Sequence, residues 1–233
     1  DGKIYLYSSE HSPSTPLRRD AFIWCVDTTS GQLLWKIQAW PSGLAIGDGY
    51  LIGLDLFDCQ IYCYGVGPSA TTISTPDVAV PKGTSLVVKG TVTDQSPGAK
   101  DTPAISDADQ EVWMEYIYQQ RPMPTDVTGV PVHVTAIDPN GNFQDIGVCT
   151  SDIGGSYAIA WVPPVEGTYQ VTATFAGSKA YGSSYATTHF VVDPASSAAP
   201  LVTASPTVPS TPAQTPAQTA SASPSATTAP QPT

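Results

Sequence analysis

The chain of 233 residues carries 9 basic and 20 acidic side chains, which gives a formal net charge of −11. Unneutralised carboxylates repel phosphate, so this balance argues against nucleic acid and against anionic lipid as partners. No stretch is apolar for long enough to cross a membrane, so membrane attachment is expected only through an anchor beyond Thr233.

The first 66 residues contain a repeat. The sequence DGKIYL at Asp1–Leu6 returns as DGYLIG at Asp48–Gly53. Likewise IWCVD at Ile23–Asp27 returns as IYCYG at Ile61–Gly65. Each copy predicts a turn, a strand, a connection and a second strand, and the first copy is lengthened by a polar loop at 8–20. Repeats of this size that are made of short strands are typical of propeller blades or solenoids.

The first copy continues through Asp27-Thr-Thr-Ser-Gly31 to Trp35. An aspartate side chain bonds nearby backbone amides and glycine tolerates positive φ, so Asp27 and Gly31 are expected to close a tight turn. Trp35 supplies a large flat surface for packing between sheets. This string resembles the repeat of the quinoprotein-type, or PQQ-binding-like, β-propellers, in which aspartate, a Thr/Ser-Gly turn and tryptophan recur once per blade.

The resemblance implies that residues 1–66 are the incomplete, terminal blades of a longer propeller. After Tyr64-Gly65 there is no turn and no tryptophan, so the second copy lacks its last strand. Ring-closing blades often borrow such a strand from the other end of the chain. The resemblance also raises a PQQ-dependent oxidoreductase as an alternative, but fold analogy alone does not establish an activity.

The sequence holds no catalytic or nucleotide-binding pattern. It has neither a Gly-x-Ser-x-Gly nucleophile elbow nor a Gly-Lys-Ser/Thr phosphate loop. His11 is isolated, and His133 and His189 are expected to point outward from strands. We therefore predict a protein that is not an enzyme, with no catalytic residue and no cofactor.

The four cysteines do not form a disulfide framework. They are Cys25, Cys59, Cys63 and Cys149. Cys59 and Cys63 are expected to share a strand face roughly 13 Å apart, too far to pair. All four are predicted to be buried free thiols that pack as small hydrophobic groups.

Residues 67–193 predict a β-sandwich, because several segments alternate between apolar and polar side chains. Val132 and Val134 share one face with His133 on the other, and the apolar side of 169–175 also faces the core. The run from Trp161 to Tyr169 resembles bacterial and archaeal Ig-like modules, with Tyr169 placed like a corner tyrosine. Such modules serve mostly as spacers and adhesive units on cell surfaces.

An inserted amphipathic helix is predicted at about 107–120. Ser106 followed by Asp109 is typical of a helix start, and Pro122 ends the run. Apolar residues repeat four positions apart, at Val112/Trp113 and Tyr116/Ile117. We expect this helix to lie across an open edge or end of the sandwich, or against the propeller sheets.

The candidate metal ligands lie in one turn. Asp138, Asn140, Asn142 and Asp145 offer oxygens to Ca²⁺. The glycine is not where a calcium loop needs it and no closing glutamate follows, so a plain hairpin turn is favoured and no metal is predicted.

Aromatic side chains are the candidates for ligand contact. Six lie in the repeat, at Tyr5, Tyr7, Trp24, Trp40, Tyr62 and Tyr64. They suit either a carbohydrate platform or packing between blades, and packing is favoured. Tyr181 and Tyr185, in a glycine- and serine-rich loop, are expected to be better placed to contact a partner.

The segment 194–233 holds no charge, aromatic residue or glycine. Such a composition predicts a disordered Pro/Ser/Thr/Ala stalk that is rich in acceptors for O-glycosylation. We therefore predict a secreted or cell-surface scaffold and adhesion protein whose propeller binds a surface glycan or protein. The alternative is a self-assembling surface-layer or filament subunit that pairs with copies of itself.

Overall fold

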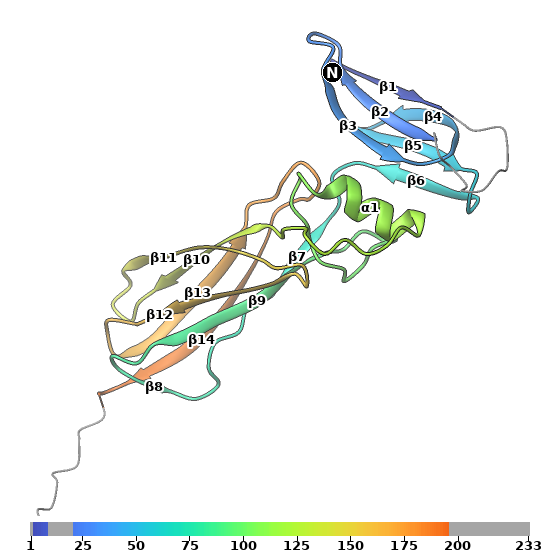
Figure 1. Cartoon of the computed structure of the whole chain (residues 1–233). Coiled ribbons are helices and arrows are strands. Elements are labelled where there is room, and N and C mark those ends of the chain that lie inside the picture. The colour runs from blue at the N-terminus through green and yellow to red at the C-terminus, as the bar shows by residue number, and fades with distance from the viewer. Residues whose placement is uncertain (1, 9–20, 196–233) are drawn as a thin grey trace, which may run out of the picture. The chain divides into compact units, whose positions relative to one another are not determined.

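The computed structural model describes residues 2–8 and 21–195. Over these residues the chain is predominantly β, with fourteen strands in four sheets and one helix (Figure 1). The all-β prediction is confirmed at this level. The loop predicted at 8–20 and the stalk predicted at 194–233 fall outside the described residues, except at their ends.

The N-terminal strands form two antiparallel sheets of three consecutive strands each. Sheet I has the order β1-β2-β3 and sheet II the order β4-β5-β6. The strands are β1 (Lys3–Tyr7), β2 (Phe22–Asp27), β3 (Leu33–Gln38), β4 (Pro41–Gly47), β5 (Tyr50–Asp55) and β6 (Gln60–Tyr64). Their β-branched and aromatic residues favour extended backbone. Asp48 and Gly49, with φ of 49° and 84°, turn the chain between β4 and β5.

The two sheets repeat one hairpin in the same register. Tyr5 pairs with Cys25 in sheet I. In sheet II, Ile52 pairs with Cys63, and these residues hold the equivalent positions of the sequence repeat. Strand β1 therefore corresponds to β5 and β2 to β6. The third strand pairs with the second strand of the hairpin in sheet I and with the first strand of the hairpin in sheet II.

Sheets I and II pack face to face through aliphatic and aromatic side chains. Ile23 is fully buried and Leu51 is 3% exposed. The Trp35 ring lies 5.9 Å from the Tyr5 ring and 6.5 Å from the Tyr64 ring, measured between centroids. The rings are partly buried and pack around the buried aliphatic side chains, so both kinds of side chain contribute to the contact between the sheets.

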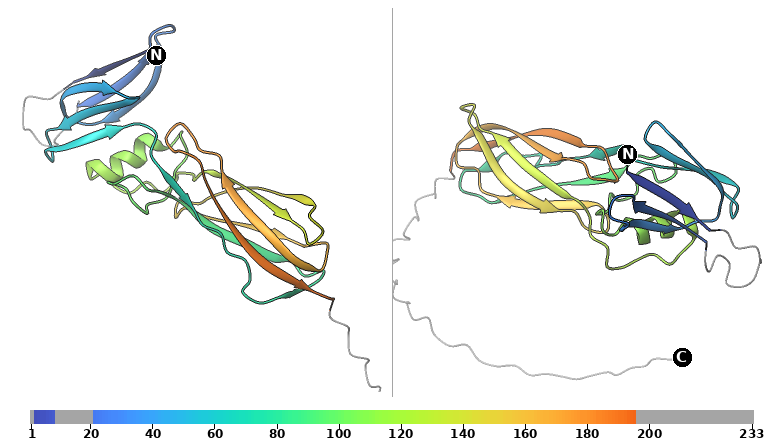
Figure 2. Two further views of the ribbon diagram at one scale, coloured as in Figure 1. Left: turned by 180° about the vertical axis from the view of Figure 1, so that it is seen from behind. Right: turned by 90° about the horizontal axis from the view of Figure 1, so that it is seen from above.

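The remaining strands form two facing sheets (Figure 2). The five-stranded sheet has the order β11-β10-β13-β14-β8 and the other has the order β12-β9-β7. The strands are β7 (Ser69–Thr71), β8 (Val80–Pro81), β9 (Leu86–Asp94), β10 (Pro131–Ile137), β11 (Phe143–Thr150), β12 (Ser156–Trp161), β13 (Gly167–Phe175) and β14 (Ser184–Asp193). The chain changes sheets between β7, which pairs with β9, and β8, which pairs with β14 in parallel.

The core between these two sheets follows the predicted alternation. On β13 the apolar residues Tyr169, Val171, Ala173 and Phe175 are fully buried. On β10, Val132 and Val134 are fully buried, whereas His133 is exposed. Burying a side chain such as valine or phenylalanine stabilises the fold by about 1.5–3 kcal/mol relative to exposure. The period-two pattern therefore fixes which face of each strand turns inward.

The single helix of the described residues, α1 (Gln110–Gln119), is shorter than the predicted 107–120. Asp109 precedes it without capping it, because the carboxylate accepts hydrogen bonds from the backbone and hydroxyl of Thr128 instead. Ser106 donates to the same carboxylate, so it stabilises the segment that precedes α1 and not the first turn of the helix. Gln120 ends the helix in the left-handed conformation, with a φ of 54°.

Candidate functional site

The turn between β10 and β11 holds three of the candidate metal ligands. Asp138 accepts hydrogen bonds from the backbone N–H of Asn140 and Asn142, both at 2.8 Å, and from the Asn142 side-chain amide at 2.9 Å. These bonds, with the Asn142 side chain as the largest cause, lower the pKa of Asp138. Gly141 has a φ of 84°. The Asp138 carboxylate is thus engaged by its own turn, as in a plain hairpin.

The fourth candidate, Asp145, lies on β11 and faces away from that turn. Its Oδ1 is 2.8 Å from Nε2 of His133 on β10, and both side chains are exposed. The structure therefore joins Asp145 to His133 and not to Asp138. Among the described residues, no group of three or more histidine, cysteine or acidic side chains is placed to hold a metal ion.

Asp27, Gly31 and Trp35 occupy a turn and the strand that follows it. The Asp27 carboxylate accepts from the backbone N–H of Thr29 at 2.9 Å and of Ser30 at 2.7 Å. The bonds from Ser30 are the main reason that the pKa of Asp27 is lowered. Gly31 has a φ of 71° and donates its N–H to the Asp27 carbonyl. This geometry sends β3 back along β2, so that Trp35 faces sheet II.

Trp161 and Tyr169 meet in the core of the sandwich. Their rings are 5.3 Å apart and nearly perpendicular. The Tyr169 hydroxyl donates to the Val165 carbonyl at 3.0 Å and accepts from the Val165 N–H at 2.9 Å. Tyr169 therefore ties the start of β13 back to the connection that precedes it.

The aromatic candidates for ligand contact lie on different surfaces. In the repeat, Tyr5 and Tyr64 face the space between the sheets, whereas Tyr7 is 44% exposed. Tyr185 lies on β14 and not in the expected loop, and its side chain is 73% exposed. Tyr181 is only 3% exposed, because its ring packs in the core and its hydroxyl accepts from Gln110. The expectation for Tyr181 was therefore wrong.

The prediction for the cysteines holds in part. Cys25 is buried and Cys149 is half-buried, but Cys59 and Cys63 are exposed. Cys59 lies in the turn before β6 with a φ of 59°, so it shares no strand face with Cys63. Cys63 points to the side of sheet II opposite sheet I. The expected burial of these two thiols was wrong because no described residues cover that side.

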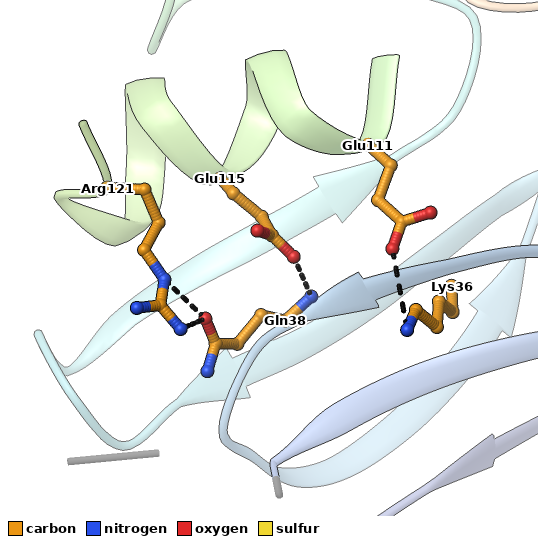
Figure 3. Close-up of polar contacts among 5 residues, drawn as sticks. All are labelled: Lys36, Gln38, Glu111, Glu115 and Arg121. Carbon is orange, nitrogen blue, oxygen red and sulfur yellow. Dashed lines mark hydrogen bonds and ion pairs between the residues drawn. The ribbon is translucent and has the colours of Figure 1, made fainter. Parts of the chain in front are cut away.

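Helix α1 contacts the N-terminal sheets through a group of polar side chains that sequence reasoning missed (Figure 3). The Gln38 backbone N–H, at the end of β3, donates to the Glu115 carboxylate at 3.1 Å. Arg121 donates to the Gln38 side-chain oxygen through Nε at 2.7 Å and through its terminal nitrogen. Gln38 is 2% exposed, so these bonds satisfy polar groups that water does not reach. The spacing of Glu111 and Glu115, one helical turn apart, is the one signal in the sequence for this surface.

A buried carboxylate extends this contact. Asp55, at the end of β5, is 2% exposed and accepts from the backbone N–H of Trp40 at 3.0 Å and of Phe57 at 2.8 Å. Gln119 on α1 also donates to Asp55, at 3.3 Å. A buried polar group is costly unless it is hydrogen-bonded, so Asp55 ties the connection between β3 and β4, the end of β5 and the helix together. We call Gln38, Asp55, Glu115, Gln119 and Arg121 the junction.

Apolar and ionic contacts flank the junction. Met114 packs against the cluster between sheets I and II, and Tyr118 meets the Tyr62 ring edge-on at 5.3 Å. Lys36 lies 4.0 Å from Glu111, an exposed pair of little energetic weight. Burial raises the pKa of Glu111, since partial removal from water disfavours its charged form. The junction is thus held mainly by partly buried hydrogen bonds and by the packing of Met114.

Both N-terminal sheets also expose large apolar side chains on the sides that face away from each other. On sheet I, Ile4 is 48% and Leu6 is 53% exposed. On sheet II, Ile61 is 73% exposed.

The described residues define a predominantly β protein with a polar junction between helix α1 and the N-terminal sheets. No model of a known protein family matches the chain, and no curated protein is detectably similar to it. Within the part of the chain that the structure describes, no helix has the length and apolar character to span a membrane.

Proposed function

We propose that this chain is a non-enzymatic, surface-displayed binding and scaffold protein. Sheets I and II are blades of a quinoprotein-type β-propeller that presents a recognition face. Residues 67–193 are an Ig-like module that carries them, and a hydroxyl-rich stalk, 194–233, holds both away from the cell envelope. The partner is a surface glycan or a surface protein.

The repeat supports the propeller assignment. Equivalent residues of the two copies pair in the same register, and sheets of consecutive antiparallel strands stack face to face. Stacked sheets of this kind around a centre are the architecture of propellers. The turn from Asp27 to Gly31 and the contacts of Trp35 agree with the roles that the blade motif gives those residues.

The strand order supports the Ig-like assignment. Four strands of the five-stranded sheet, β11-β10-β13-β14, and the facing sheet β7-β9-β12 follow an order similar to the C′-C-F-G and A-B-E sheets of immunoglobulin sandwiches. Tyr169 lies near the start of β13, the F-like strand, and its hydroxyl bonds to the backbone four residues upstream. This is the pattern of a tyrosine corner.

The observation that carries the proposal is the junction. The inserted helix and Arg121, which follows it, make hydrogen bonds to the ends of β3 and β5, so the sandwich does more than follow the sheets in sequence. A sandwich that holds sheets I and II by such bonds is suited to presenting their recognition face to a partner. The acidic charge and the uncharged, hydroxyl-rich C-terminal sequence add support for an extracellular setting.

Binding is tested with the full chain on a glycan array and on insoluble chitin, cellulose and peptidoglycan. We expect saturable retention on at least one of these probes. The same chain, mixed with pyrroloquinoline quinone and Ca²⁺, is assayed for dye reduction with alcohols and sugars. Retention on none of the probes, or redox turnover, would count against the proposal.

The presenting role of the junction is tested by ¹⁵N relaxation. We expect sheets I and II and the sandwich to tumble with one correlation time in the wild type. The double variant Glu115→Ala/Arg121→Ala should separate them into two. Glu166→Ala, which breaks only the exposed 3.4 Å pair with Lys82, is the control and should leave one correlation time. Two correlation times in the wild type would contradict the presenting role.

A further inference from the structure

Strand β14 of the sandwich has one long side without a partner strand. On its other side it pairs with β13 along nearly its whole length. On the open side, Gly67 bridges to Tyr181 just before β14, and β8 pairs only with Val192 and Asp193. Within the part of the chain that the structure describes, no strand pairs with 185–191 on this side. At about 3.3 Å per residue the open stretch is roughly 23 Å long, which is within the ordinary length of a strand.

The backbone alternation shows which groups face this open side. The Lys82 N–H donates to the Asp193 carbonyl, so the backbone of Asp193 faces β8. Every second residue of a strand turns its N–H and C=O to the same side, so the backbones of Tyr185, Thr187 and His189 face the open side. Among the described residues, none bonds these backbone groups on that side. A row of unpaired donors and acceptors of this kind is a template for another strand.

A groove runs beside the same stretch of β14. It has a volume of about 560 Å³ and lies between Thr188–Val191 of β14 and residues 73–79, which connect β7 to β8. Ligand-binding clefts have volumes of about 300–1,000 Å³, so the groove has room for a bound chain. Phe190 belongs to the core of the sandwich and Ile73 packs against that core. The groove therefore offers apolar contacts beside the unpaired backbone.

Elsewhere the five-stranded sheet has edges that oppose the addition of a strand. Strand β8 is only two residues long and ends in Pro81. Strand β11 is bulged at Ile146, where its register with β10 shifts. Short strands, proline and bulges all blunt a sheet edge. The stretch 185–191 has no proline, lysine, arginine or acidic residue, and its register with β13 is continuous. This stretch is thus open to another strand.

We propose that the groove binds an extended segment of another protein, which adds to the five-stranded sheet as a strand beside β14. The backbone of the segment bonds to Tyr185, Thr187 and His189, and every second side chain enters the groove. Unpaired N–H and C=O groups at strand spacing are matched by another extended backbone, and main-chain hydrogen bonds supply affinity in complexes of this kind.

The charge of the groove favours a basic segment. Asp77 is the one charged side chain among the residues that line it, and the chain as a whole carries a net charge of −11. Charges of opposite sign steer and orient a partner, so the segment has lysine or arginine beside Asp77 and small or β-branched residues elsewhere. This site lies on the sandwich. It is separate from the recognition face proposed for sheets I and II, so either proposal fails without the other.

Binding is measured with the full chain by fluorescence anisotropy of a labelled peptide, acetyl-KVTVKVT-amide. We expect saturable binding. The same peptide with every backbone nitrogen methylated keeps its side chains and charge but donates no backbone hydrogen bond, so it should bind at least about tenfold more weakly. A wild type that binds neither peptide, or both equally, would overturn the proposal, because equal binding reports attraction between charges alone.

Two substitutions at one position test the backbone contact from the side of the protein. His189→Pro removes an N–H that faces the open side, where a strand tolerates proline. His189→Ala keeps that N–H and is the matched control. We expect His189→Pro to weaken binding at least about tenfold and His189→Ala to change it less than about twofold. Circular dichroism checks that both variants are folded, and if His189→Pro is not, the methylated peptide decides. Equal affinity of two folded variants would contradict strand addition.

The preference for a basic segment has its own control. Asp77→Asn should weaken binding of the lysine peptide about threefold, whereas Asp126→Asn, an exposed acid outside the groove, should leave it unchanged. Equal effects of the two variants would overturn the basic segment as the occupant. Light scattering of the chain without peptide tests a second copy in its place. Multimers of the wild type that His189→Pro abolishes would assign this edge to a second copy and overturn the proposal.

Discussion

Replacing Tyr169 by phenylalanine removes one buried hydroxyl and leaves the ring in place. That hydroxyl makes two hydrogen bonds to the Val165 backbone, at 2.9 and 3.0 Å, while the Tyr169 side chain is fully buried. A hydrogen bond contributes about 1 kcal/mol net, and its loss leaves the Val165 N–H and carbonyl without their partner. We therefore expect Tyr169→Phe to lower the free energy of unfolding by about 2 kcal/mol.

Urea denaturation at pH 7 measures this loss of unfolding free energy. For a folded unit of about 150–250 residues, a loss of about 2 kcal/mol corresponds to a fall in melting temperature of about 4–8 °C. Tyr185→Phe is the matched control, since Tyr185 is 73% exposed and we expect a change below about 0.5 kcal/mol. Equal stability of the two variants would refute the reasoning, because it would mean that the bonds between Tyr169 and Val165 do not hold the start of β13.

Three further predictions concern the core, a close backbone contact and a turn. Phe175→Ala should cost about 3–5 kcal/mol in urea denaturation, whereas Phe143→Ala, at a site 68% exposed, should cost little. Gly90→Ala would drive a Cβ into a backbone carbonyl oxygen and should cost about 1–3 kcal/mol, whereas Gly43→Ala meets no atom and should be near neutral. Asp138→Ala should lower the urea midpoint at pH 7. Because the folded-state pKa of Asp138 is lowered, its contribution is present above the unfolded pKa of about 3.9 and is lost as the pH falls through the folded value, so wild type and variant should converge in acid.

Much of the core of the sandwich could be predicted from the alternation of apolar and polar residues along its strands. A strand with a two-residue side-chain period and one wet face can turn only one set of residues inward, so Val132, Val134 and the apolar residues of β13 were predictable as core. The turn at Asp138 was predictable for a similar reason, because its bonds join residues at most four apart. The sequence pattern therefore predicts those features of the structure that depend only on residues close together in the chain.

The errors have one physical source. Tyr181 and Cys63 were assigned by sequence context, yet Tyr181 is buried by core residues and by Gln110, which lies 71 positions away. Cys63 is exposed because the described residues end the stack of sheets there. Whether a side chain is covered depends on which distant segment folds over it, and no local pattern encodes that segment.

The sequence by itself determined the β character of the chain, the repeat in the first 66 residues, the helix near 110 and the inward faces of the main strands. These properties arise from side-chain period, turn chemistry and residue propensity over a few neighbours. Only the tertiary structure decided that Gln38 and Asp55 meet α1, and that equivalent faces of the repeat are covered in one copy and open in the other. Both depend on contacts between segments far apart in the chain, because burial is set by packing and not by the order of residues.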